Sequence, residues 1–434
     1  MTIQAVAIVA AIVFFYGLAS RSLTNRSISG PLVFTIVGAL VGPWAFDVVG
    51  GEFGEGGVEV LAEATLVLIL FADATRIDLR VLRNQTTLPV RMLGIGLPLT
   101  VVFGTLAAML LFSDLGLWEA ALVAAILAPT DAALGQAVVS NPRVPVRVRQ
   151  ALNVESGLND GLMLPAITIL LAVAAAEAGI ESSTNWVVFV AQQVGLGLLV
   201  GLVVGCVGGW ALDYCSQRNW VEGVMRQLAT LSVAVGAFAL ANAVGGNGFV
   251  AAFIAGMAFG FVATESCESA ADFTEDEGQL LALLTFLFFG ALLLGPRLAD
   301  LSPSIAIYAL VSLTVVRMVP LALSVIGVGL ELPTIGYLGW FGPRGLASIL
   351  FGLFVVEEVE LAGSETMLDI VTWTVFASIV LHGLTAGPFA NRYGNWFEAM
   401  MNPSDADGTP IEMDPMVEAE PVAEMRQRLT PPGD

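Results

Sequence analysis

Residues 117–140 read LWEAALVAAILAPTDAALGQAVVS, an apolar segment long enough to cross a membrane that Pro129 and Asp131 interrupt at its middle. Proline removes a backbone donor and clashes with the preceding turn, so we expect the helix to break there. Residues 333–356 repeat this pattern, with Gly342-Pro343-Arg344-Gly345 at the centre. Unwound backbone at membrane depth must line a cavity or be buried in protein, so paired breaks indicate a transporter site built from inverted repeats. The alternative is two unrelated proline kinks.

The composition places the chain in lipid. Of 434 residues, 56% are hydrophobic and 13% charged, whereas soluble domains carry about 25% charged residues. The 38 acidic residues outnumber the 17 basic ones, which excludes a nucleic-acid partner because few cations are available to neutralise phosphates. His382 is the single histidine and the three cysteines lack metal-ligand spacing. We therefore expect no cofactor and no metal other than a transported ion.

Thirteen apolar segments are long enough to cross about 30 Å of hydrocarbon. Arginines test this number, because basic residues near helix ends concentrate on the cytoplasmic side. With the N-terminus outside, fourteen of the 17 arginines are cytoplasmic, Arg297 is outside, and Arg317 and Arg344 lie within the membrane. The pattern predicts an all-α polytopic protein of the cell membrane with a cytoplasmic C-terminus. The predicted segments are 4–20, 31–46, 58–76, 88–112, 117–140, 150–176, 185–212, 224–244, 248–264, 280–296, 303–328, 333–356 and 368–390.

Two parts of the chain differ in composition. Residues 1–392 hold all thirteen predicted segments and form the transmembrane domain. Residues 393–434 are acidic and rich in proline and methionine, a composition typical of a disordered tail. The predicted topology places this tail in the cytoplasm.

Six charged residues fall at membrane depth. Each costs about 2.5 to 3.5 kcal/mol there and therefore needs a physical reason. A buried charge of this kind indicates a functional site or a buried ion pair. The six are Asp73, Asp131, Glu155, Asp160, Arg317 and Arg344.

Residues 155–161 read ESGLNDG and begin the sixth segment. In a helix, Glu155 and Asn159 share one face, while Ser156 and Asp160 share the neighbouring face. The first pair can hold an ion pair and its amide support, and the second can offer a hydroxyl and a carboxylate to a hard monovalent cation. A purely structural polar network is the alternative. The predicted sodium ligands are Asp160, Asp131, Ser156 and Thr130.

Competition for Asp160 would produce exchange of a cation for a proton. Either ion can neutralise this carboxylate, and each excludes the other, so the neutralised site can cross the membrane barrier. Asn159 cannot titrate, and we expect peptide N–H groups at the helix break to keep Asp131 ionised. The sequence therefore predicts electroneutral antiport of Na⁺, Li⁺ or K⁺ for H⁺, serving pH and sodium homeostasis.

Four stretches carry a resemblance to a known family: Thr130-Asp131, residues 155–161, Trp340 to Leu346 (WFGPRGL) and His382-Gly383-Leu384-Thr385. They resemble the signature segments of the NhaP-type sodium/proton antiporters, a cation/proton antiporter family that includes the eukaryotic NHE exchangers. The similarity spans about residues 4 to 392. It implies an NhaA/NhaP-like fold with two broken helices crossing at the midplane, in a homodimer. It further implies a moving core, 88–176 and 303–390, and a dimerisation scaffold, 4–76 and 185–296.

The resemblance also implies roles for single residues. Asp160 resembles the essential cation and proton carrier. Glu155 and Arg344 match a buried ion pair that, with Asn159, braces the core, and the role of Arg317 stays open. Further site residues are Thr130, Asp131 and Ser156.

Asp73 departs from the family pattern. It lies in Phe71-Ala72-Asp73-Ala74, where relatives often have a glutamate followed by glycine. Asp73 is therefore a candidate ligand or a carboxylate at the mouth of a funnel. His382 follows a family pattern, and we expect it to be structural.

Two other classes of function deserve comparison. An intramembrane aspartyl protease would use two membrane-depth aspartates, but that class has a Gly-x-Gly-Asp setting, and this chain has Gly157-Leu158-Asn159-Asp160. An ion-coupled organic-anion symporter of the same fold would place unpaired arginine at the centre, whereas Arg344 has Glu155 available as a partner. Antiport of a cation therefore stays the favoured prediction.

Overall fold

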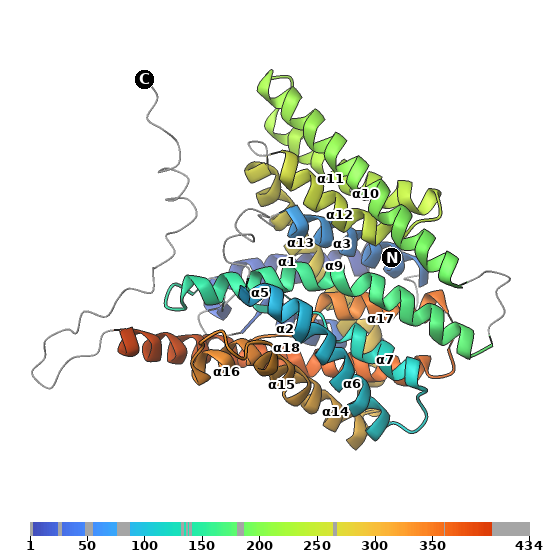
Figure 1. Ribbon diagram of the computed structural model, residues 1–434, viewed down its shortest axis with the longest axis vertical. Helices are drawn as coiled ribbons and strands as arrows, with labels where there is room; N and C mark the ends of the chain where they lie inside the picture. Colours follow the sequence, from blue (N-terminus) through green and yellow to red (C-terminus); the bar gives the residue numbers. More distant parts are fainter. Residues whose placement is uncertain are drawn as a thin grey trace, which may run out of the picture.

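The computed structural model describes residues 3–24, 28–47, 55–75, 87–131, 134–135, 138, 141–179, 186–263, 267–359 and 361–401. Within these ranges the regular structure is entirely helical (Figure 1). The all-α prediction is confirmed. Of the predicted tail at 393–434, residues 393–401 are helical and form the end of the last helix, so the prediction is wrong there, and residues 402–434 lie outside the described residues.

Each of the thirteen predicted segments coincides with a helix or a run of consecutive helices in the described ranges. Seven of these helices are long and apolar enough to cross a membrane by themselves, and shorter apolar helices accompany them. The helices are α1 (Ile3–Thr24), α2 (Gly30–Val41), α3 (Glu55–Thr75), α5 (Thr87–Arg91), π-helix η1 (Met92–Gly96), α6 (Leu97–Leu111), α7 (Leu117–Ile126), α9 (Val146–Glu177), α10 (Trp186–Gln217), α11 (Gly223–Ala243), α12 (Gly248–Val262), α13 (Cys267–Phe288), π-helix η2 (Phe289–Leu294), 3₁₀-helix η3 (Pro296–Ala299), α14 (Pro303–Leu313), α15 (Val315–Ser324), α16 (Leu332–Trp340), α17 (Leu346–Glu358) and α18 (Ser364–Met401).

The helices pack as two groups on either side of α9. On one side α10 packs against α11 and α12, and α12 packs against α3. On the other side α6 packs against α7, and α14 packs against α18. Figure 1 shows α10 to α12 at the top, α14 to α16 at the bottom and α9 running across the molecule between them. Because α9 contacts α7, α3 and α12, its polar residues lie where the two groups meet.

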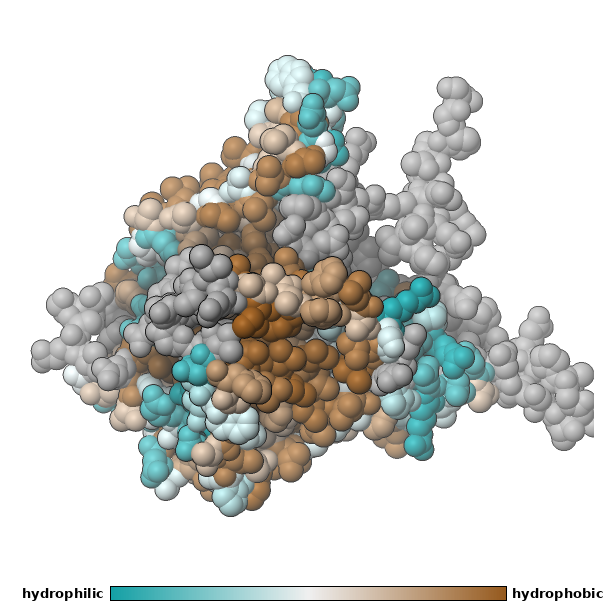
Figure 2. Space-filling model, turned by 180° about the vertical axis from the view of Figure 1, so that it is seen from behind, coloured by the Kyte–Doolittle hydropathy of each residue, from teal (hydrophilic) through white to brown (hydrophobic). Residues whose placement is uncertain are grey.

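The outer surface is apolar over a broad area. Figure 2 shows this area with hydrophilic side chains gathered toward its left and right margins. Large side chains such as Phe15 on α1, Leu110 on α6 and Trp210 on α10 are more than half exposed, at 66%, 85% and 59%. Exposed apolar side chains on spanning helices suit a hydrocarbon environment, where no water must be excluded.

Both predicted helix breaks are present. α7 ends at Ile126, and residues 127–131 are not helical; α16 and α17 are separated by the non-helical residues 341–345. The Asp131 peptide N–H donates to the Pro343 carbonyl oxygen at 2.8 Å, so the two unwound stretches lie side by side. The sequence did not predict a third interruption, at Thr314 between α14 and α15, where φ is −112° and ψ is −86°.

Candidate functional site

The Asp131 carboxylate holds the two breaks together. Its Oδ2 accepts the Leu346 peptide N–H at 2.7 Å, and its Oδ1 accepts the Leu134 peptide N–H at 3.2 Å. Leu346 is the first residue of α17, and a carboxylate at a helix N-terminus is stabilised by the unpaired N–H groups and the helix dipole. A Cβ at Gly345 would collide with this carboxylate, which explains why glycine stands there.

Arg344 binds the C-terminal end of a helix, whereas Asp131 binds an N-terminal end. Its guanidinium donates to the carbonyl oxygens of Ala128 and Pro129, just beyond the end of α7. Four carbonyls at a helix C-terminus lack helical partners, and a cation there also opposes the negative end of the dipole. Ser348, one turn further along α17, donates to the Ile126 carbonyl at 2.8 Å. The residues that begin α17 therefore satisfy the carbonyls that α7 leaves open.

Side chains of α18 form hydrogen bonds with the backbone at the break between α16 and α17. The Arg344 peptide N–H donates to Ser378 Oγ at 2.6 Å, and His382 Nε2 lies 2.9 Å from the Trp340 carbonyl oxygen. Sequence reasoning missed Ser378, although its i,i+4 spacing from His382 places both on one face of a helix. His382 is 1% exposed and bonds the backbone, as the structural interpretation predicts.

The predicted ion pair between Glu155 and Arg344 is wrong. Glu155 pairs instead with Arg317, whose NH2 donates to Oε2 at 2.6 Å and whose NH1 donates to Oε1. The side chains are 1% and 3% exposed, respectively. Arg344 is committed to the carbonyls at the end of α7, and Arg317, on α15, presents its planar guanidinium to both carboxylate oxygens, which is the strong geometry for such a pair.

The hydroxyl groups beside the break form a short chain. Thr130 Oγ1 lies 2.9 Å from Ser156 Oγ and accepts the Asn159 Nδ2–H at 2.7 Å. All three residues are buried. Asn159 therefore does not support the ion pair, contrary to the prediction from sequence, because its amide donates to Thr130 instead. The structure does bring Thr130 and Ser156 together, as the predicted ligand set requires.

Asp160 is the least satisfied acid of this region. It is 7% exposed, and its Oδ1 is buried without a hydrogen-bond partner among the described residues. Asp73 and Asp131 are the carboxylates whose charges act on it. Asp73 lies in α3 next to α9, with its carbonyl oxygen 3.8 Å from the position that a Cβ of Gly157 would take. The structure thus gathers three carboxylates at the junction of α3, α9 and the α7 break.

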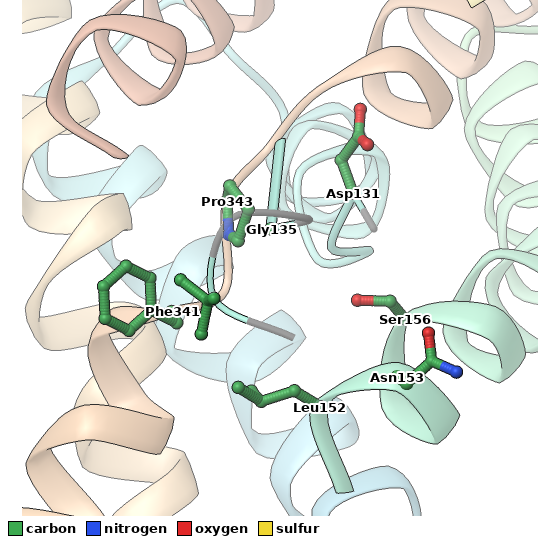
Figure 3. A pocket seen from close by; sticks show the side chains of 8 residues that line it. Asp131, Gly135, Leu152, Asn153, Ser156, Phe341 and Pro343 are labelled. Carbon is green, nitrogen blue, oxygen red and sulfur yellow. The ribbon is translucent and has the colours of Figure 1, made fainter. Parts of the chain in front are cut away.

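A cavity reaches Asp131 and Ser156 at this junction. Its empty volume is about 260 Å³, including space open to solvent, and Asn153 at its wall is exposed. In Figure 3, the Ser156 hydroxyl points toward the cavity, whereas the Asp131 carboxylate points away from it. The lining residues are Asp131, Gly135, Val138, Leu152, Asn153, Ser156, Phe341 and Pro343. We call this space the Ser156 cavity.

Comparison with known proteins identifies the family. The family model described as "Sodium/hydrogen exchanger, transmembrane" matches residues 8–392. The chain belongs to this family. Among sodium/hydrogen exchanger relatives, it is similar to the K(+)/H(+) antiporter NhaP2 of Shewanella oneidensis, 25% identical over 355 residues, and to the Na(+)/H(+) antiporter ApNhaP of Aphanothece halophytica, 27% identical over 354 residues. These matches cover 78% and 77% of this chain and 60% and 65% of the relatives.

A solved structure supports the same fold. The sodium proton antiporter MjNhaP1 from Methanocaldococcus jannaschii matches with a TM-score of 0.72 and 19% identity, covering 90% of this chain and 99% of that chain. The predicted NhaP-like fold of a polytopic membrane protein is therefore confirmed. Membership of the sodium/hydrogen exchanger family does not favour a protease or an organic-anion symporter.

Proposed function

We propose that the protein exchanges a monovalent cation for a proton, with Asp160 carrying either ion. The observation that carries this proposal is the buried Asp160 Oδ1 without a hydrogen-bond donor among the described residues. A charged carboxylate in such a place is costly unless a proton or a cation neutralises it. Two further carboxylates act on Asp160, and their repulsion strengthens the need for a positive partner.

The neighbouring oxygens suit a hard cation. Ser156 lies one turn before Asp160 on the same face of α9, and its hydroxyl oxygen is 2.9 Å from that of Thr130 in the α7 break. Oxygen ligands of this kind favour Na⁺ and similar ions, and they complete a ligand set with Asp160. The names of the similar relatives include both K⁺ and Na⁺, so the proposal covers both cations.

The exchange is electroneutral in this proposal. Asp131 accepts two peptide N–H bonds, and hydrogen bonds to a carboxylate favour its ionised form. Asp131 then stays charged throughout and belongs to the site as a fixed negative charge. One titrating carboxylate, Asp160, is left to bind either one H⁺ or one monovalent cation.

Alternating access requires two bodies that move against each other. We assign residues 88–176 and 303–390 to a moving core, and residues 4–76 and 185–296 to a scaffold that pairs with a second copy. The exposed apolar side chains of α1 and α10 support pairing or lipid contact at this surface. The protein resides in the cell membrane with its N-terminus outside, its C-terminus in the cytoplasm and a role in pH and sodium homeostasis.

Flux in proteoliposomes tests the proposal. Proteoliposomes that contain the purified protein are given a pH gradient across their membrane. Adding Na⁺, Li⁺ or K⁺, each in turn, should dissipate this gradient. Asp160→Asn keeps the shape but removes the titrating charge, so exchange should vanish while folding survives. Asp213→Asn, on α10, is the matched control and should exchange like the wild type. Exchange at the wild-type rate in Asp160→Asn, or no response of the wild type to any cation, would refute the proposal.

A further inference from the structure

A second cavity lies beyond the helix break, on the side toward which α17 runs. Its empty volume is about 320 Å³, including space open to solvent. α17 begins at the break and leads away from it, and its residues Leu350, Leu353 and Glu357 line this cavity, whereas residues of the break itself line the Ser156 cavity. The lining residues are Glu63, Leu66, Phe249, Leu350, Leu353, Phe354 and Glu357. We call this space the glutamate cavity.

Aromatic rings lie both in the wall of the glutamate cavity and beside the residue that follows Asp160. Phe249 and Phe354, both in the cavity wall, face each other with ring centroids 6.0 Å apart and planes at 82°. One turn further along α12 lies Phe253, which is 4% exposed. Three of its ring carbons lie 2.5 Å from the position that a Cβ of Gly161 would take. The ring therefore rests directly on the backbone of the residue that follows Asp160.

The contact between Phe253 and Gly161 joins α12, in one group of helices, to α9, which lies between the two groups. α12 belongs with α3, α10 and α11, whereas α9 carries the cation site. Glycine at 161 lets the ring approach, and a ring on a glycine backbone makes an apolar contact that directs no hydrogen bond. Such a contact excludes water and ions when closed, since apolar constrictions block ions by losing water. It can also separate without leaving a buried polar group unpaired.

We propose that Phe253 seals Asp160 from the glutamate cavity, and that this cavity is the second entrance by which cations reach Asp160 when the Phe253–Gly161 contact opens. The inference rests on the proposed exchange. An antiporter must never open its site to both sides at once. In the structure the Ser156 cavity is present, while the Phe253 ring covers the backbone at Gly161. Glu63 and Glu357 place negative charge in the second entrance, which raises the local cation concentration.

Proton-to-cation stoichiometry tests the seal. In proteoliposomes with the potential clamped by K⁺ and valinomycin, Phe253→Ala should let Na⁺ move down its gradient with fewer protons in return, at least about a twofold drop in the ratio, because an open apolar constriction admits water and ions. Phe259→Ala is the matched control. Phe259 lies on the same helix and is 0% exposed, and its ring centroid is 5.7 Å from that of Phe71. It should keep the wild-type ratio.

Thiol labelling gives a readout that does not depend on transport. In a background with Cys206, Cys215 and Cys267 replaced by serine, Ser156→Cys should react with an impermeant maleimide faster from the side of the Ser156 cavity than from the other side, which reaches the site only while the Phe253–Gly161 contact is open. Adding Phe253→Ala should raise the rate of labelling from the other side. Gly161→Ala displaces the ring from the opposite direction and should have the same effect, which keeps the test available if Phe253→Ala does not fold.

The two proposals fail in different ways. A wild-type protein that moves no cation would refute the proposed exchange, while labelling would still test the seal. Unchanged stoichiometry together with unchanged labelling rates from both sides in Phe253→Ala or Gly161→Ala would overturn the seal and leave the exchange intact. Loss of coupling in Phe259→Ala as well would also overturn it, because general loosening of α12 would then explain the leak.

Discussion

The pair formed by Glu155 and Arg317 makes a sharp energetic prediction. Both side chains are almost fully buried, at 1% and 3% exposure, and they meet through two hydrogen bonds. Arg317→Gln leaves the Glu155 charge buried without its partner, which costs about 3 to 5 kcal/mol, and Glu155→Gln strands the arginine at a similar cost. The double variant buries no charge from this pair and should lose less than either single variant. The coupling free energy is therefore at least about 3 kcal/mol.

Reversible unfolding in mixed detergent and SDS micelles measures this cycle. Glu155→Gln/Arg344→Gln is the matched control, because Arg344 donates to backbone carbonyls at the end of α7 and losing Glu155 does not relieve them. That double variant should be destabilised more than the Glu155→Gln/Arg317→Gln protein. Additive losses for Glu155 and Arg317, with strong coupling for Glu155 and Arg344, would refute the assignment and restore the pair predicted from sequence.

Three further predictions concern the site. A K⁺/valinomycin potential should leave the equilibrium cation distribution across proteoliposomes unchanged, and a shift would implicate Asp131 or Asp73 as a second proton carrier. Thr130→Val removes a proposed ligand oxygen and the acceptor of the Asn159 amide, so the apparent KM for the cation should rise in flux assays while Thr130→Ser stays near the wild type. His382→Phe keeps the bulk of the ring but removes the bond to the Trp340 carbonyl, so thermal unfolding should show a loss of about 1 to 3 kcal/mol; an unchanged midpoint would show that α18 does not hold the break through this residue.

Local chemistry determined the helices and the site face. The thirteen segments follow from runs of apolar residues, and the breaks at Pro129 and Pro343 combine a proline, which removes a backbone donor, with a charged neighbour at membrane depth. A proline alone does not decide a break, because Pro165, Pro320 and Pro388 lie inside helices. The placement of Ser156 and Asp160 on one face of α9 follows from helical periodicity alone. These features were predictable because each depends on residues within a few positions of one another.

Only the tertiary structure decided which distant groups meet. Two buried arginines, Arg317 and Arg344, could each have paired with Glu155. Which one does so depends on how α15 is oriented after the interruption at Thr314 and on the carbonyls at the end of α7 that Arg344 binds. The resting place of the Phe253 ring on Gly161 likewise has no local signal, since any aromatic residue of α12 suits an apolar interior. Partner choice depends on the relative position of packed helices, which the sum of many side-chain contacts sets, and no single motif encodes that sum.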